Sequence, residues 1–230
     1  MKDILENIYN ESEEKYYSYL FDLINKNQKK FIITVNPEII MKSYKDKTIK
    51  DMLLNKDNSL VPDGISVVKK AKLYKIKIKE RITGIDISSK LITICKENNK
   101  SIYLFGSKEE VVSSLYNKLK KENVNVLGYT NGYVKDKDKE FEKIVKLKPD
   151  VILVALGVPN QELLINKHIN KFSKGIFVGV GGSFDVLSSY KKRAPKFFIK
   201  CHLEWLYRIV KEPKRIKRFI ENNIIFMFKK

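Results

Sequence analysis

One aspartate, Asp63, stands where a general base would be useful. It follows the short apolar run Ser59–Val61 and lies in the turn Pro62-Asp63-Gly64, which would hold its carboxylate in a fixed direction. An aspartate with an ordinary pKa is ionised at neutral pH, so it can take the proton of a substrate hydroxyl as a new C–O bond forms. Because Pro, Asp and Gly are also common turn residues, a purely structural interpretation stays open.

A glycine-rich segment, Gly179-Val180-Gly181-Gly182, is the second feature suited to chemistry. Glycines let backbone amides approach a phosphate, especially beside a helix N-terminus. The segment is not a dinucleotide fingerprint, since that pattern would need a glycine where Phe184 stands. Asp185 can accept hydrogen bonds from a base or a ribose, or it can cap the following helix. A simple strand-to-helix turn is an equally good interpretation of the glycines.

Other polar residues follow apolar runs elsewhere in the chain. Thr34 and Asn36 come at the end of the first run, and Gln161 and Glu162 follow a later one. The last two are either polar site residues or the exposed first turn of a helix. Arg81 lies in a basic stretch that would ordinarily be solvated surface.

Six apolar, β-branched runs alternate with helix-like segments and indicate how these residues are positioned. The predicted strands are Phe31–Val35, Ser59–Val61, Ser101–Phe105, Asn125–Gly128, Val151–Leu156 and Ile176–Val180. Runs that are apolar on both faces are typical of parallel strands covered by helices on each side. We therefore predict an α/β fold with a doubly wound, mostly parallel, Rossmann-like sheet, whose strand ends bring the polar residues to one crevice. Asn36 before Pro37, and Ser107 with Glu110, predict two helix starts.

The last 35 residues differ from the rest of the chain in composition. Residues 196–230 contain ten Lys or Arg and three Glu, a net charge of +7, interleaved with apolar and aromatic residues. Two amphipathic helices separated near Glu212-Pro213 are expected, with no strand. We predict an α/β domain over residues 1–195 and a basic helical appendage over residues 196–230. Arg208, Arg215 and Arg218 follow helical spacing and can share one face, although a solvated charged face is the ordinary interpretation.

The net charge of +19 over 230 residues points to an anionic partner. Nucleic acid, an acidic membrane surface and a phosphorylated substrate all fit, so a basic nucleic-acid-binding protein with an α/β fold is one alternative. No nucleic-acid motif is recognisable, and the basic residues are spread along the chain. A nucleotide-dependent oxidoreductase is a weaker alternative because the glycine fingerprint is broken. The two cysteines and two histidines lack metal-ligand spacing, so no metal site is expected.

Taken together and in order, these segments resemble the WecG/TagA/CpsF family of glycosyltransferases. The matching segments are Thr34-Val35-Asn36-Pro37-Glu38, Pro62-Asp63-Gly64, Gly106-Ser107, Gly132-Tyr133, Gly157-Val158-Pro159-Asn160-Gln161-Glu162, Gly179–Asp185, Arg193-Ala194-Pro195, Leu203–Arg208, and Glu212-Pro213-Lys214-Arg215 with Arg218. Each segment alone is weak evidence, but their collinear order over roughly residues 30–220 is specific.

The resemblance implies an inverting, metal-independent hexosyltransferase without a cofactor. It would move N-acetylmannosamine, or a related hexosamine, from a UDP-N-acetylhexosamine donor to the lipid-diphosphate-linked GlcNAc of GlcNAc-diphosphate-undecaprenol. Such transfers serve the synthesis of wall teichoic acid or a related surface polysaccharide. The resemblance assigns the following roles: Asp63 as the base; Thr34, Asn36, Arg81 and Gln161 at the sugar; Tyr133, Gly181 and Asp185 at the uridine; Arg208, Arg215 and Arg218 at the leaving diphosphate.

The same resemblance implies where the protein acts. The N-terminus has no apolar segment typical of a secretory signal, and no apolar run approaches the roughly 18 residues that span a bilayer. We expect a cytoplasmic protein, peripheral on the inner face of the cell membrane, whose basic appendage binds an anionic membrane surface. A homo-oligomer is possible.

Overall fold

Six parallel strands form one sheet in the computed structural model, which describes residues 1–229 apart from the side chains at positions 215 and 218. The strands are β1 (Lys29–Val35), β2 (Ser59–Pro62), β3 (Ser101–Gly106), β4 (Asn125–Thr130), β5 (Val151–Ala155) and β6 (Gly175–Gly179). Their order across the sheet is β2-β1-β6-β5-β3-β4, and every pair is parallel. All six predicted strands and the Rossmann-like, doubly wound class are confirmed.

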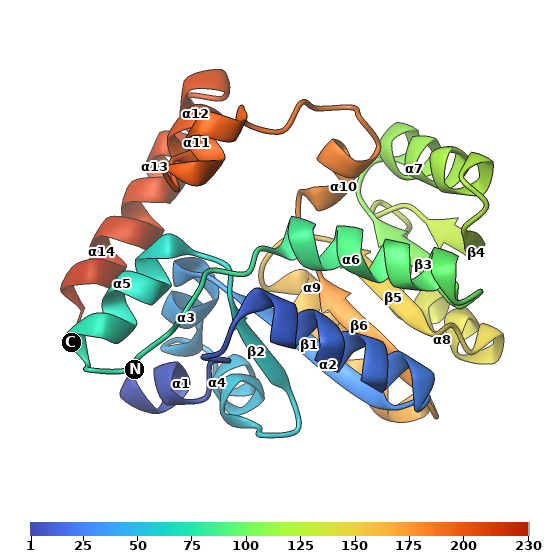
Figure 1. Ribbon diagram of the computed structural model, residues 1–230, viewed down its shortest axis with the longest axis horizontal. Coiled ribbons are helices and arrows are strands. Elements are labelled where there is room, and N and C mark those ends of the chain that lie inside the picture. Colours follow the sequence, from blue (N-terminus) through green and yellow to red (C-terminus); the bar gives the residue numbers. More distant parts are fainter. Residues whose placement is uncertain (230) are drawn as a thin grey trace.

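Helices cover both faces of this sheet (Figure 1). One face carries α2 (Glu13–Asn25), α6 (Gly84–Glu97), α7 (Glu109–Lys121) and α10 (Ser183–Leu187). The other carries α1 (Lys2–Glu6), α3 (Pro37–Ser43), α4 (Lys47–Leu54), α5 (Ile65–Leu73), α8 (Lys137–Leu147) and α9 (Asn160–His168), followed by the short turn η1 (Ile169–Lys171).

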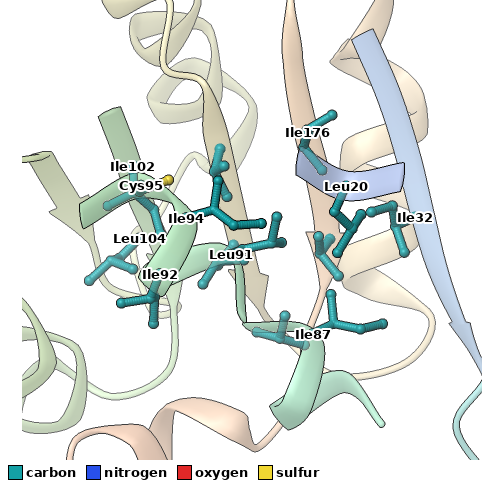
Figure 2. Close-up of a cluster of buried hydrophobic side chains, with 14 of the residues drawn as sticks. Leu20, Ile32, Ile87, Leu91, Ile92, Ile94, Cys95, Ile102, Leu104 and Ile176 are labelled. Carbon is teal, nitrogen blue, oxygen red and sulfur yellow. The ribbon is translucent and has the colours of Figure 1, made fainter. Parts of the chain in front are cut away.

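Alternate side chains of each central strand enter two separate hydrophobic cores. In β1, Ile32 packs into the core beneath α2 and α6, while Ile33 packs into the core on the opposite face. Figure 2 shows the first core, where Leu91 of α6 lies among side chains from the strands. Such two-sided burial is what the continuous apolar runs predict for parallel strands. The sheet is therefore rigid beneath the loops that follow its carboxyl edge.

One of the two predicted helix starts is confirmed and the other is wrong. The side chain of Asn36 accepts a hydrogen bond from the backbone N–H of Ile39, 3.1 Å away, and Pro37 is the first residue of α3. Ser107 does not cap α7. It has a φ of 61°, and Lys108 precedes the helix without a side-chain cap. Ser107 instead belongs to the turn out of β3, where its N–H donates to the carbonyl of Ala155.

The described C-terminal segment forms helices and no strand, as expected, but turns divide it into more than two helices. It comprises α11 (Lys196–Lys200), α12 (Glu204–Lys211), α13 (Arg215–Phe219), the π-helical η2 (Ile220–Ile224) and α14 (Ile225–Phe228). The predicted break near Glu212-Pro213 is confirmed, since α12 ends at Lys211. After this break, α13, η2 and α14 follow one another directly, and α14 lies beside α5 (Figure 1). We call residues 196–230 the appendage.

The far end of the appendage is fixed to the α/β body. Phe226 is fully buried in the core that contains α3 and α5. The buried ammonium of Lys70 donates to the carbonyls of Met227 and Lys229, at 2.8 and 2.7 Å, where the last turn of α14 leaves carbonyls without helical partners. Within residues 1–229, no helix has the length and apolar character needed to cross a bilayer.

Candidate active site

A cleft of about 730 Å³ opens at the carboxyl ends of β1, β2, β5 and β6, and the appendage forms one of its walls. Eight of the residues predicted from the sequence line it: Thr34, Asn36, Asp63, Arg81, Gln161, Gly181, Asp185 and Arg208. They come from strand ends, loops and helix starts spread between positions 34 and 208, and the parallel sheet and the appendage bring them together at one edge, where ligands of such folds bind.

Asp63 lies just after β2, and two backbone interactions fix it. Its N–H donates to the carbonyl of Val35, and its Oδ1 accepts from the N–H of Gly84 at 3.2 Å. Burial raises the pKa of this carboxyl above its usual range. Arg81, the Gly84 amide and Arg208 each oppose that shift, while Glu204 adds to it. The carboxylate is thus held in one direction with a raised proton affinity, as a general base requires.

Arg81 crosses from the body to the appendage. Its guanidinium forms a largely buried ion pair with Glu204, the first residue of α12. The side chain of Arg81 is only 11% exposed. The interpretation of Arg81 as a solvated surface residue is therefore wrong. Glu204 also lies 3.7 Å from the guanidinium of Arg193, which pairs with Asp86 of α6 at 2.8 Å.

Thr34 and Asn36 lie at the end of β1 and make local hydrogen bonds. The Thr34 hydroxyl donates to the carbonyl of Gly179 at 3.0 Å, joining β1 to β6. The Asn36 oxygen is used in capping α3. The hydroxyl oxygen of Thr34 and the amide nitrogen of Asn36 keep hydrogen-bonding capacity toward the cleft.

Gln161 joins two loops of the cleft. Its Oε1 accepts from the N–H of Gly157 at 3.1 Å and from that of Gly181 at 2.9 Å, and its Nε2 donates to Glu162 at 2.7 Å. Both glycines have positive φ values, 77° and 50°, which glycine adopts without strain. Gln161 is only 1% exposed, so the interpretation of residues 161 and 162 as an exposed helical turn is wrong.

Glu162 is fully buried beneath these loops. Its Oε2 has no hydrogen-bond partner in the described part of the chain, and burial raises its pKa to about 7. A Cβ added at Gly179 would lie 2.6 Å from Gln161 Nε2 and 3.0 Å from Glu162 Oε1. A glycine is therefore needed at position 179 because the two side chains pack directly against that backbone.

The glycine-rich segment forms the floor beside α10. Gly181 and Gly182 line the cleft, and a Cβ added at Gly182 would meet no described atom within 4 Å, so a ligand can approach the backbone there. Asp185 lies in the first turn of α10 and pairs with Lys191 at 3.4 Å. Position 185 therefore offers a carboxylate within the cleft rather than a helix cap, because Gly182 occupies the N-cap.

Tyr133 is the one described candidate that lies elsewhere. It is 75% exposed and lines a separate hollow of about 750 Å³, together with Ser107, Gly132, Lys137 and Lys167. No described residue lines both hollows. The structure thus does not bring Tyr133 together with Gly181 and Asp185.

The appendage contributes aromatic and cationic side chains to the cleft. Trp205 and Phe219 stack with ring centroids 4.4 Å apart and planes 10° from parallel, and both line the cleft. Arg208 lines it as well. Arg215 and Arg218 belong to α13, but their side chains lie outside the part that the structure describes.

Two residues of this site were not assigned from the sequence. Glu204 and Arg193 lie within segments that carry the family resemblance, yet only the fold brings them to Arg81 and Asp86. A glutamate at the start of an amphipathic basic helix is ordinarily a solvated helix-start residue. The sequence gives one indirect indication that Glu204 has basic partners, because it is the single acidic residue between positions 186 and 211.

Comparison with known proteins agrees with this geometry. The family model described as "Glycosyl transferase WecG/TagA/CpsF family" matches residues 3–230. A protein of Bacillus subtilis (strain 168) named N-acetylglucosaminyldiphosphoundecaprenol N-acetyl-beta-D-mannosaminyltransferase is 39% identical over 191 residues, 82% of this chain and 74% of that protein. Proteins of the same name from Bacillus spizizenii and Staphylococcus aureus (strain MW2) are 37% and 36% identical, over 86% of this chain and 77% and 78% of theirs. With its parallel sheet, its aspartate-centred cleft and a match over nearly its whole length, the chain belongs to the WecG/TagA/CpsF family of glycosyl transferases.

Proposed function

We propose that this protein transfers N-acetylmannosamine, or a closely related hexosamine, from its UDP form to GlcNAc-diphosphate-undecaprenol. The relatives named above carry this acceptor and this sugar in their names. The single observation that carries the proposal is the position of Asp63, fixed in the cleft with its carboxylate beside two arginines.

In the proposed reaction, Asp63 is the general base. The acceptor hydroxyl oxygen, the 4-hydroxyl of GlcNAc, bonds to the anomeric carbon while the bond from that carbon to the UDP oxygen breaks. The hydroxyl proton passes to Asp63, and the configuration of the anomeric carbon inverts. A positioned base contributes roughly 10²–10⁴-fold to such a step.

Departing UDP gains negative charge, so cationic groups must stabilise it. Arg208 lies on the cleft wall that the appendage contributes and is suited to this role. Arg215 and Arg218 follow on α13 and are proposed to act with it. Thr34, Asn36, Arg81 and Gln161 surround the sugar in this proposal, and Gly181 and Asp185 bind the nucleotide. Tyr133 would reach the uridine only if that group extends toward the second hollow.

The acceptor lipid lies in a bilayer, so we further propose that the protein acts as a peripheral protein on the cytoplasmic face of the membrane. The surface of the appendage supports this location. It exposes a set of large apolar side chains that includes Phe197, Val210, Ile216, Ile225 and Phe228, among many basic residues. Each basic residue near an anionic leaflet adds about 1 kcal/mol of attraction. Association into homo-oligomers stays a prediction.

The test is a panel of radiolabelled UDP-hexosamines with a short-chain GlcNAc-diphosphate-lipid acceptor, assayed with the full chain. We expect label to enter the lipid product from UDP-N-acetylmannosamine or one close analogue. If no UDP-sugar gives a labelled lipid while the protein shifts RNA or DNA in salt-sensitive gels, the nucleic-acid-binding alternative replaces this proposal.

A further inference from the structure

Glu204 is a buried acidic residue at the junction between the appendage and the body. It is 6% exposed and begins α12, where the helix N-terminus favours a negative charge. Its two carboxylate oxygens face different arginines, Oε2 facing Arg81 and Oε1 facing Arg193. Both arginines precede the appendage in the chain. Glu204 is therefore the point at which the appendage is tied electrostatically to the α/β body.

The ion pairs form a connected series that reaches the catalytic cleft. Asp86 of α6 pairs with Arg193, Arg193 lies beside Glu204, and Glu204 pairs with Arg81. The series ends in the cleft that Asp63 also lines, where the charges of Arg81 and Glu204 both act on the Asp63 carboxyl. Removing one partner of a buried pair leaves the other charge uncompensated, so the members of such a series depend on one another.

The central observation is that Arg81 forms its ion pair with Glu204. Two carboxylates, those of Asp63 and Glu204, lie near its guanidinium, and in the described part of the chain its ion pair is with Glu204. A direct pair between Arg81 and Asp63 would neutralise the base and occupy the oxygen that has to take a proton. With Arg81 paired to Glu204, the Asp63 carboxylate accepts, among the described residues, a hydrogen bond from the N–H of Gly84.

We propose that Glu204 is a positioning residue that holds Arg81 beside Asp63 without letting the two pair, so that Asp63 stays available as the base. The catalytic part of this inference rests on the proposed function. The structural part, that Glu204 holds the appendage and Arg81 in place together, does not.

Besides Arg81 and Glu204, two described groups act on the Asp63 carboxyl: one charged side chain and one backbone amide. Arg208 of α12 lowers its proton affinity from the appendage side, and the amide of Gly84 does so from the start of α6. In Glu204→Gln an anion is lost and Arg81 is free to move to Asp63. Both changes favour ionised Asp63, so the acid limb of the kcat/KM profile should move to lower pH. A less basic carboxylate is also a weaker proton acceptor, so kcat should fall on the order of tenfold or more.

The matched control is Glu221→Gln, which removes the same charge from an exposed position of the appendage. It should leave the acid limb and kcat unchanged, and Glu204→Asp, which keeps the carboxylate, should recover much of both. If Glu204→Gln lowers activity but leaves the acid limb where it is, the residue is merely structural and the positioning role is overturned. Wild-type behaviour of Glu204→Gln would overturn it as well.

Hydrogen exchange tests the structural part independently of turnover. In Glu204→Gln, backbone amides of residues 204–211 and of residues 81–88 should exchange faster than in the wild type and in Glu221→Gln. If Glu204→Gln does not fold, Arg81→Lys takes its place, because lysine keeps the charge but not the planar fork. Unchanged exchange over residues 204–211 in the folded variant would refute the inference. If the wild type transfers no sugar, the proposed function fails, and the exchange data still decide whether Glu204 holds the appendage in place.

Discussion

The carboxylate of Asp63 accepts a hydrogen bond from the backbone N–H of Gly84, the first residue of α6, at 3.2 Å. The turn after β2 and the start of α6 are thereby joined at the proposed base. An N–H at a helix start has no partner within its own helix, so Asp63 uses a donor that would otherwise face the cleft. One carboxylate oxygen is held, and Asp63 as a residue is half-buried and lines the cleft.

Asp63→Asn should remove transfer while preserving the fold. Asparagine is close in size and can still accept the Gly84 hydrogen bond, but it cannot take a proton. We expect kcat to fall by about 10²–10⁴-fold, measured with the radiolabelled donor. The melting temperature should stay level or rise, because burial disfavours the charged aspartate. Asp57→Asn, at an exposed position outside the cleft, is the control. Near-normal turnover in Asp63→Asn would remove this residue from the mechanism.

Glu162 should make the protein less stable as pH rises. Its folded pKa is about 7, against about 4.3 for an unfolded glutamate, so the folded state binds the extra proton between these values. The free energy of unfolding should therefore decrease as pH rises from about 4 to about 7, by on the order of 2–4 kcal/mol. In Glu162→Gln this contribution to the pH dependence of stability is absent, because glutamine does not ionise.

Urea unfolding at pH 5 and at pH 8 measures this effect. The stability of Glu162→Gln relative to the wild type should be more favourable at pH 8 than at pH 5. Equal differences at the two pH values would mean that the carboxyl ionises normally in the folded protein.

Gln161→Ala should loosen both loops at once. Two backbone N–H groups, those of Gly157 and Gly181, would lose their acceptor, which costs about 1–3 kcal/mol for each group that stays buried. We expect a lower melting temperature and a fall in kcat/KM of at least about tenfold through displaced loops. The exposed glutamine at position 28 provides the control, as Gln28→Ala. A variant that keeps its stability but binds the donor weakly would argue for a direct sugar contact instead.

Lys70 should control how firmly the end of the appendage is held. Lys70→Met keeps most of the side-chain length but removes both hydrogen bonds to the carbonyls of Met227 and Lys229. Trypsin should then cleave within residues 211–229 faster than in the wild type, as followed by mass spectrometry. Lys69→Met, at an exposed neighbouring position, should leave the cleavage rate unchanged. Equal rates in both variants would show that the other contacts, such as the burial of Phe226 and the Ser66–Asn223 hydrogen bond, hold this end without Lys70.

Exposed apolar residues of the appendage should determine membrane binding. Val210 is 69% exposed and Phe228 is 84% exposed, so replacing both with serine removes apolar surface without opening a core. Sedimentation with vesicles of mixed phosphatidylglycerol and phosphatidylcholine should show at least about tenfold weaker binding. Leu147→Ser, at an exposed site at the end of α8, should bind like the wild type. If the double variant binds normally, these two residues do not enter the bilayer.

The inner strands β1, β3, β5 and β6 could be predicted from the sequence because burial on both faces demands continuous apolar runs. The edge strand β4 is only partly buried, and its pattern is correspondingly weaker. Asn36 could be predicted as a cap because its signal is local. Ser107 could not, since the positive φ of the turn out of β3 overrides an equally good local pattern. The partners of Arg81, Glu162 and Glu204 depend on contacts across the fold, which no spacing along the chain encodes. The position of Tyr133 likewise depends on the path of the loop between β4 and α8, which leads to the second hollow.

The bridge that Gln161 makes between the loops at Gly157 and Gly181 also bears on attempts to alter the sugar that the protein accepts. One amide oxygen satisfies both loops, so neither can change its path without releasing the other. A chimera that takes residues 157–162 from a relative with another donor should fold poorly unless residues 179–185 come with them. We therefore predict that loop exchanges in this cleft have to move the two loops as a pair.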